Sequence, residues 1–425
     1  MSAHYDVAHI IDRLQTMAAE RRPDDALLAS FIGEYFREIP NDDDAGGRRL
    51  ELAYAAAVAH LHLGRVRQRG ETLVQVLSPD LERDGWESER SVLMFVTDDA
   101  PFLVDSVRMV LDQHELGIHL LVHPMLRVRR DDRRVIVDAA AADGPIEAWT
   151  LIEIDRCGPE LGALLEGEIR GAIENVQRAV ADFTPMQERL RSVAGDDPLL
   201  TWLADQNFVF LGAATYRRSE SGLLVDPHSL LGEYRTGRLD PDRIDPPPFP
   251  GDARYSIGRT DAVADVHRPA RMASIVVRPD GTDDEVRFVG LLGSAAYRHS
   301  AFAIPVIGAR ANDVMSRMAG SVANHTGRAV RNVIETLPRD VLFELGVDDL
   351  TDLVEQIVGL QERRIVRVFD VAEPVGPWTT VLVYVPRSRF TATLPEHVAA
   401  LVAEHYGGDT RDLETFVGPT TDQTR

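Results

Sequence analysis

The chain of 425 residues contains no lysine, because all 46 of its basic residues are arginine. Without a lysine amine these residues cannot form a Schiff base, act through a lysine general base or supply the phosphate-binding lysine of a P-loop. The single cysteine, Cys157, excludes an internal disulfide, and no zinc-ligand pattern surrounds it. The segment GLLGSAA at 290–296 fits neither G-x-G-x-x-G nor G-x-S-x-G, so it predicts neither a dinucleotide site nor a hydrolase.

Long apolar runs are also missing, since no segment approaches the ~20 residues needed to cross a bilayer. The first residues, MSAHYDVAHIIDRLQ, lack the basic start and apolar block of a secretory signal. The net charge of −22 repels nucleic-acid phosphates and anionic lipid. We therefore expect a cytoplasmic protein that binds neither nucleic acid nor membrane.

What is present is the composition of a soluble globular protein, with 44% apolar and 27% charged residues. The length predicts about two to four domains. Helical spacing of apolar residues predicts an N-terminal helical motif at 1–68. Residues 69–190 then follow the order ββαβββα, which is typical of an antiparallel sheet with helices on one face.

The rest of the chain predicts a further α+β domain, a helical connector and a partial repeat. Residues 191–310 combine strand patterns with the proline-rich segment RIDPPPFPGDARY, which we expect at the surface. Residues 311–362 are helical in pattern. Residues 363–425 repeat the order ββαβ, with DLETFVG at 412–418 as the last strand present, and the predicted second copy is truncated before its last strands and helix.

The turn TDDAPFLVDS at 97–106 places carboxylates where a strand meets a helix. One interpretation is that Asp98 or Asp99 caps the helix, which would stabilise it by about 1 kcal/mol. The other is a ligand site: the ammonium of a small amphoteric molecule would meet the aspartates, and its carboxylate the helix N–H groups. The candidate effector-binding residues are Asp98, Asp99, Pro101, Phe102 and Asp105.

Other polar residues give weaker patterns. His267, Arg268 and Tyr297 belong to one predicted domain and could line a polar pocket, although surface loops are the alternative. Three histidines lie in HELGIHLLVH at 114–123, but no HExxH-type motif accompanies them, so we predict no metal site. No nucleophile, base and orienting partner can be named together, and we predict no catalytic residue in these 425 residues.

Five segments together resemble the N-terminal region of the large NAD-dependent glutamate dehydrogenases of bacteria. They are LERDGWESERSVLMFVTDDAPFLVDSVRMVL from 81, TWLADQNFVFLGAATY from 201, VHRPARM from 266, RFVGLLGSAAY from 287 and NVIETLPRDVLFEL from 332. The resemblance implies ACT-like domains of ferredoxin-like fold at 69–190 and 363–425, a PAS-like sensor domain at 191–310 and helical motifs. ACT domains commonly bind amino acids at strand-to-helix turns and often have glycine at the position of Phe102.

The resemblance further implies that these residues are a regulatory and oligomerisation segment without a cofactor of its own. In such a polypeptide a separate C-terminal domain uses NAD to oxidise glutamate, and we expect a homo-oligomer that responds to an amino-acid effector. The alternative is a free-standing amino-acid-sensing ACT/PAS protein without an enzyme domain.

Overall fold

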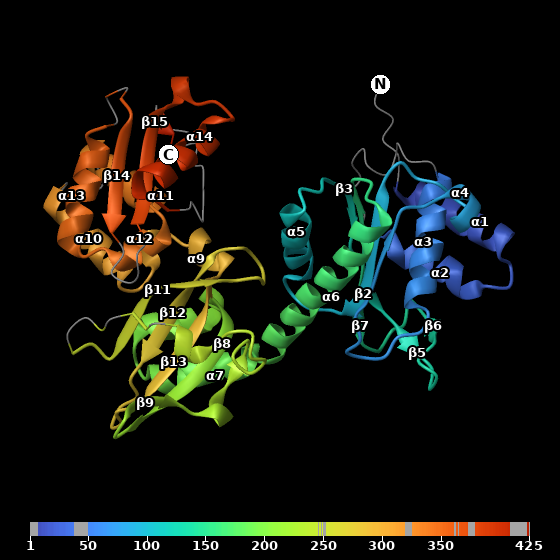
Figure 1. Cartoon of the computed structure of the whole chain (residues 1–425), viewed down its shortest axis with the longest axis horizontal. Helices are drawn as coiled ribbons and strands as arrows, with labels where there is room; N and C mark the ends of the chain where they lie inside the picture. The colour runs from blue at the N-terminus through green and yellow to red at the C-terminus, as the bar shows by residue number, and fades with distance from the viewer. Residues whose placement is uncertain are drawn as a thin grey trace. The chain divides into compact units, whose positions relative to one another are not determined.

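The computed structural model divides the chain into two compact units (Figure 1). The first comprises residues 1–180 with the short segment Asp265–Arg268, and the second comprises residues 181–264 and 269–425. The structure describes residues 7–37, 50–244, 246–247, 249, 252–318, 325–360, 363, 365–372, 379–408 and 423–424. Antiparallel sheets and helices in both units confirm the predicted α+β class.

An antiparallel sheet of order β1-β2-β7-β3, with β4 also paired to β7, forms the centre of the first unit. Its strands are β1 (Leu73–Leu77), β2 (Ser91–Asp98), β3 (Ile118–Val122), β4 (Met125–Arg127) and β7 (Ile146–Ile154). A small hairpin of β5 (Arg129–Arg130) and β6 (Ile136–Asp138) lies beside it. Strand β2 is buried from Ser91 to Thr97, which explains why its sequence is apolar almost without interruption.

Helices cover both faces of this sheet, whereas the sequence predicted helices on one face only. Helices α1 (Val7–Arg21), α2 (Ala26–Tyr35) and α3 (Leu50–Gly64) share one core with Val92, Met94 and Val96 of β2. Helices α5 (Leu103–Gln113) and α6 (Pro159–Ala181) lie over the opposite face (Figure 1). The residues on both faces of β2 are apolar, and two apolar faces need two covering layers. The prediction missed the first layer because it treated the N-terminal helices as a separate motif.

A buried histidine, His60, links helices α2 and α3 to strand β2 of the sheet. The Tyr35 hydroxyl lies 2.8 Å from Nδ1 of His60, and Nε2 of His60 lies 3.1 Å from the Phe95 carbonyl oxygen. A carbonyl oxygen only accepts, so Nε2 carries the proton and Nδ1 accepts the Tyr35 hydrogen. Burial lowers the pKa of His60 to about 3, outweighing the opposing effect of the Phe95 hydrogen bond.

This histidine gives the first unit a defined pH dependence. Between pH 6.5 and about 3 the unfolded His60 binds a proton and the folded His60 does not, so stability falls as pH falls below 6.5. We expect a contribution of about 1 kcal/mol lost between pH 6.5 and 5.5. Urea unfolding at a series of pH values should show this slope in the wild type, and His60→Gln should lack it. An unchanged slope in the variant would contradict the assignment.

The second unit begins with helices α7 (Phe183–Ala194) and α8 (Pro198–Trp202), followed by a sheet of order β10-β8-β13-β12-β11, with β9 paired to β8. Its strands are β8 (Phe208–Ser219), β9 (Gly222–Val225), β10 (Leu231–Gly232), β11 (Tyr255–Val263), β12 (Arg271–Val277) and β13 (Glu285–Leu292). The strand patterns of NFVFLGAATYRR, ARMASIVVRPD and EVRFVGLLGS in the sequence correspond to β8, β12 and β13, whereas β11 was not predicted. Its buried residues include Ser256 and Thr260, so it lacks an apolar alternation.

Helices follow this sheet, as predicted: α9 (Ser294–Arg298), α10 (Ile307–Met318), α11 (His325–Thr336), α12 (Arg339–Glu344) and α13 (Val347–Val358). The C-terminal part then contains β14 (Arg367–Ala372), β15 (Thr379–Pro386), α14 (Leu394–Tyr406) and the short β16 (Gln423–Thr424). The strand predicted at 412–418 lies outside the described residues. Within the described ranges, no helix has the length and apolar character needed to span a membrane.

Candidate functional site

The predicted strand-to-helix turn joins β2 to α5. Strand β2 ends at Asp98, the backbone N–H of Asp99 donates to the Ile146 carbonyl at 3.3 Å, and α5 begins at Leu103. Leu103 and Val107 are buried and anchor the first turns of α5 to the sheet. Asp99 and Pro101 are exposed, so part of the turn is open to solvent.

The capping interpretation of the aspartates is wrong. Phe102 is the N-cap residue of α5 and forms no side-chain capping bond. It has φ +69°, in the left-handed region where a side chain is disfavoured and glycine is tolerated. The Phe102 ring packs against the ring of His267, with 4.5 Å between the two ring centres.

Asp98 is held by an arginine from a distant part of the chain. Its carboxylate forms an ion pair with Arg67 and accepts the backbone N–H of Gly70 at 3.0 Å. Arg67 is only 2% exposed, so this charge is shielded from water. The partners lie 31 residues apart, and no local pattern could have predicted the pair. Asp98 therefore fixes the end of β2.

Arg67 also joins Asp98 to a second carboxylate at the start of β7. Arg67 Nη1 donates to Glu147 at 2.9 Å, and Arg130 donates to the same carboxylate at 2.8 and 2.9 Å through Nε and Nη2. The Trp149 indole N–H donates to Glu147 at 3.2 Å. We call Arg67, Asp98, Arg130 and Glu147 the Arg67 cluster. Its two cations and two anions balance, which is what burial of charge requires.

Asp105 and Phe102 of the turn both contact His267, which the sequence had assigned to a different candidate pocket. His267 Nδ1 lies 3.1 Å from the Asp105 carboxylate, and its ring centre is 4.5 Å from that of Phe102. The His267 backbone N–H donates to the Ser106 hydroxyl at 3.1 Å. The sequence assigned His267 to another pocket because 162 residues separate it from Asp105. Arg268 lies in the same segment, whereas Tyr297 belongs to the second unit.

Chemically, this end of the turn is acidic and partly apolar. Asp99 and Asp105 are exposed carboxylates, and Phe102 and Pro101 provide apolar surface between them. An ammonium group can be attracted to such carboxylates, and helix N–H groups near the start of α5 attract an anion. Among the residues the structure describes, no group of three or more His, Cys, Asp or Glu could hold a metal ion.

The three histidines of residues 114–123 have separate partners. His114 pairs with Glu168 and His119 with Asp155, both at 2.6 Å, while His123 contacts the Thr150 hydroxyl. The hydrogen bond from His119 is the main reason why the pKa of Asp155 is lowered. Cys157 is buried, with its sulfur 3.5 Å from the Ser91 hydroxyl. These contacts hold strands and helices together.

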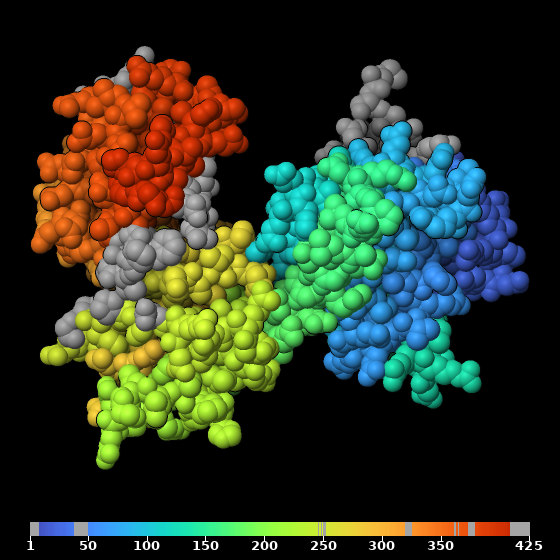
Figure 2. Space-filling view, in the orientation of Figure 1, coloured from blue at the N-terminus to red at the C-terminus, as the bar shows by residue number. Residues whose placement is uncertain are grey.

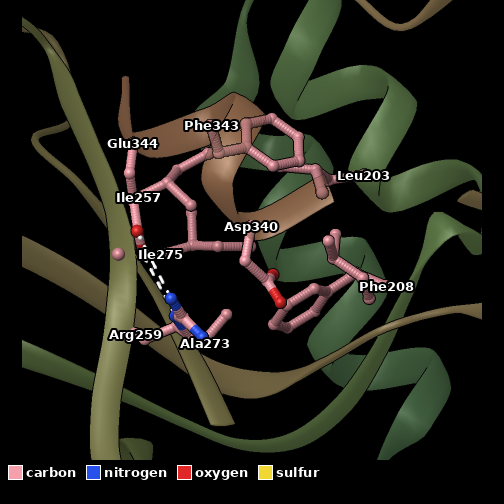
Figure 3. A pocket seen from close by; sticks show the side chains of 11 residues that line it. Leu203, Phe208, Ile257, Arg259, Ala273, Ile275, Asp340, Phe343 and Glu344 are labelled. Atoms are coloured by element: carbon pink, nitrogen blue, oxygen red, sulfur yellow. Dashed lines mark hydrogen bonds and ion pairs between the residues drawn. The ribbon is translucent and has the colours of Figure 1, made fainter. Parts of the chain in front are cut away.

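A pocket lies within the second unit between the sheet and α12 (Figure 3). It is lined by Leu203, Phe208, Ile257, Gly258, Arg259, Ala273, Ile275, Leu292, Asp340, Phe343 and Glu344. Arg259 Nε pairs with Glu344 at 3.1 Å, and its Nη2 donates to the Thr380 hydroxyl at 2.7 Å. The space open to water is about 20 Å³, which admits one or two water molecules and is too small for an amino acid.

Comparison with known proteins places two stretches of the chain in one family. Residues 31–166 match the glutamate dehydrogenase ACT1 domain, and residues 304–363 match glutamate dehydrogenase helical motif 1. The first match begins inside α2, which agrees with the shared core of the N-terminal helices and the sheet.

Whole-chain relatives agree with these matches. The NAD-specific glutamate dehydrogenase of Pseudomonas aeruginosa is 31% identical over 95% of this chain and 27% of its own length. The enzymes of that name from Halomonas elongata and Mycobacterium tuberculosis are 27% and 28% identical over 92% and 94% of this chain. The chain spans about a quarter of the length of these relatives. With its ACT1 and helical-motif matches, it belongs to the family of the NAD-specific glutamate dehydrogenases.

Proposed function

We propose that these residues are the N-terminal regulatory and assembly region of an NAD-dependent glutamate dehydrogenase. The observation that carries this proposal is the similarity to such enzymes along 95% of the chain but over only 27% of the relative. The catalytic domain, with its NAD, would lie in the remaining part of the same polypeptide. It would convert glutamate, NAD and water into 2-oxoglutarate, ammonium and NADH in the cytoplasm, within a homo-oligomer.

The regulatory part of the proposal rests on the ACT1 match and on the geometry of the β2–α5 turn. An α-amino acid would place its ammonium at the exposed carboxylates of Asp99 and Asp105 and its carboxylate toward the start of α5. Asp98 would support the site indirectly, because Arg67 and Gly70 already bind its carboxylate. The five-stranded core of β8 and β10–β13 would act as the PAS-like sensor domain.

The effector site can be tested by calorimetry with a panel of the common amino acids. We expect at least one to bind the 425-residue chain, and Asp105→Ala to weaken it about tenfold, because a charge-assisted contact to the ammonium is lost. Asp112→Ala is the matched control, since Asp112 is an exposed carboxylate on the same helix. Asp98→Ala is a poor probe because it would remove one of the two carboxylates that pair with the buried Arg67 and so disturb the end of β2.

Two outcomes would count against the site. If no amino acid binds the wild-type chain, the effector proposal is wrong. If Asp105→Ala and Asp112→Ala weaken binding equally, the ligand responds to general charge and lies elsewhere. Coupling to the catalytic domain would be on the order of 1–3 kcal/mol, the usual scale of allostery, and should appear as an effector-dependent shift in glutamate oxidation by the longer polypeptide.

A further inference from the structure

The loop between β11 and β12 contributes a short segment to the first unit. Asp265–Arg268 belong to that unit, although the strands on either side of them in sequence belong to the second. The Ala264 N–H donates to the Ala270 carbonyl at 2.9 Å and closes the base of the loop. Val266, inside the loop, is buried. We call Asp265–Arg268 the His267 segment.

Two helices of the first unit hold the His267 segment. Asn175 of α6 donates to the Asp265 carboxylate at 2.8 Å, and the His267 backbone N–H donates to the Ser106 hydroxyl of α5 at 3.1 Å. Asn175 and Ser106 are both buried. Figure 2 shows the atoms of α5, in teal, and of α6, in green, at the surface of the first unit. The segment is therefore anchored on two helices that solvent reaches.

The backbone of His267 is strained. Its φ is +73°, and the Arg268 N–H donates to the Val266 carbonyl across it at 3.0 Å. A γ-turn with a positive central φ is rare and disfavoured for a residue with a side chain. The His267 ring packs on Phe102, whose φ is also positive at +69°. Residues in such conformations concentrate at ligand clamps and switch regions, where surrounding contacts hold them in place.

The His267 ring lies beside the positions proposed for both ends of an α-amino acid. Its Nδ1 is 3.1 Å from Oδ2 of Asp105, the carboxylate proposed to meet the ammonium of the ligand. Its ring also packs on Phe102, the N-cap residue of α5, where the carboxylate of the ligand would approach. The imidazole is thus placed as an internal substitute for the ammonium of a ligand.

The contact between His267 and Asp105 is open enough to be exchanged for a ligand. The Asp105 side chain is 50% exposed and that of His267 is 19% exposed. In contrast, the Arg67 side chain that binds Asp98 is 1% exposed, so replacing it would break a buried ion network. A half-exposed pair contributes little to stability, whereas an ammonium brings a full charge and three donors to the carboxylate.

We propose that His267 is an autoinhibitory latch on the candidate effector site. Its imidazole occupies Asp105 in the ligand-free chain, and an α-amino acid binds by displacing it. The ring then leaves Phe102, which releases the strained φ of His267, while the bond between Asn175 and Asp265 keeps the segment on the first unit. This inference rests on the proposed effector site and adds the group that competes with the ligand there.

His267→Phe tests the latch by calorimetry with the panel of common amino acids. The variant keeps a ring beside Phe102 and removes the contact with Asp105. We expect it to bind the amino acid that the wild-type chain binds about fivefold more tightly, which is the scale of a half-exposed pair. His267→Gly also removes the imidazole and suits a positive φ, so it should bind more tightly as well and guards against a folding defect of the phenylalanine variant.

A double substitution separates competition from a structural effect. In the Asp105→Ala chain, His267→Phe should leave the affinity unchanged, because the carboxylate for which imidazole and ammonium compete is gone. His119→Phe is the matched control, since His119 forms a comparable pair with Asp155 at 2.6 Å, and it should not change the affinity. In wild-type chain with labelled histidine, the His267 ring resonances should shift when the amino acid is added, because the ring leaves Phe102.

The outcomes distinguish the latch from the site on which it rests. If the wild-type chain binds an amino acid but neither His267→Phe nor His267→Gly binds it more tightly, the latch is wrong and the effector site stands. An equal gain in affinity with and without Asp105 would show that His267 acts through the structure, and would also overturn the latch. If neither the wild-type chain nor the two variants bind any amino acid, the effector site is wrong and the latch falls with it.

Discussion

Replacement of Arg67 by methionine should lower the free energy of unfolding of the first unit by about 3–5 kcal/mol. Breaking a buried ion network by removing one partner leaves charge without compensation. Here Glu147, which is 2% exposed, would keep its ion pair with Arg130 but lose the one with Arg67, and Asp98 would lose its ion pair at the end of β2. Hydrogen exchange of the β7 amides at increasing urea concentration measures this free energy for the first unit alone.

Arg129→Met is the matched control for this experiment. Arg129 adjoins Arg130 in sequence but forms an exposed ion pair with Asp138 at 3.5 Å. Such surface pairs contribute about 0–1 kcal/mol, so the control should barely change stability. If Arg67→Met behaves like Arg129→Met, the Arg67 cluster does not hold the end of β2, and the assignment of Asp98 to a structural role fails.

Gly290→Ala should destabilise the second unit by about 3 kcal/mol through overpacking between two strands. A Cβ at Gly290 would lie 2.0 Å from the Val209 carbonyl oxygen and 2.8 Å from the Phe208 ring. The first clash is with backbone, so no rotamer change relieves it, and β8 and β13 would have to separate at the bulge after Val289. Thermal unfolding and exchange of the β8 amides measure the effect.

Gly171→Ala should have the opposite effect on stability from Gly290→Ala. Gly171 lies in α6, where an added Cβ meets no atom within 4 Å. Alanine favours the helix over glycine by about 0.5–1 kcal/mol, so this change should stabilise the first unit. A loss of stability for Gly171→Ala would contradict the open space around Gly171. An unchanged stability for Gly290→Ala would contradict the close contact between Gly290 and the Val209 carbonyl oxygen.

The elements that the sequence predicted are those with strong apolar patterns. Strands β2, β8 and β13 and helix α5 were found because burial leaves a regular spacing of apolar residues along one element. Strand β11 was missed because small polar residues such as Ser256 and Thr260 occupy its buried positions.

The contacts that define the candidate site could not be predicted in the same way. The sequence identified the turn, because an acidic pair and a proline between strand and helix form a local pattern. It did not show that Arg67 binds Asp98 or that His267 reaches Asp105, since each pair is distant in the chain and only the fold brings them together. It identified Phe102 as a departure from glycine, and the positive φ supplies the physical reason.

The most direct test of the central claim is NAD reduction with glutamate, followed by absorbance of NADH. The assay would compare the purified 425-residue chain with the full polypeptide encoded by the same gene. A regulatory region without catalytic residues predicts no NADH from the short chain and steady NADH production from the longer protein. NADH production by the 425-residue chain alone, or none by a folded full polypeptide, would contradict the proposed function.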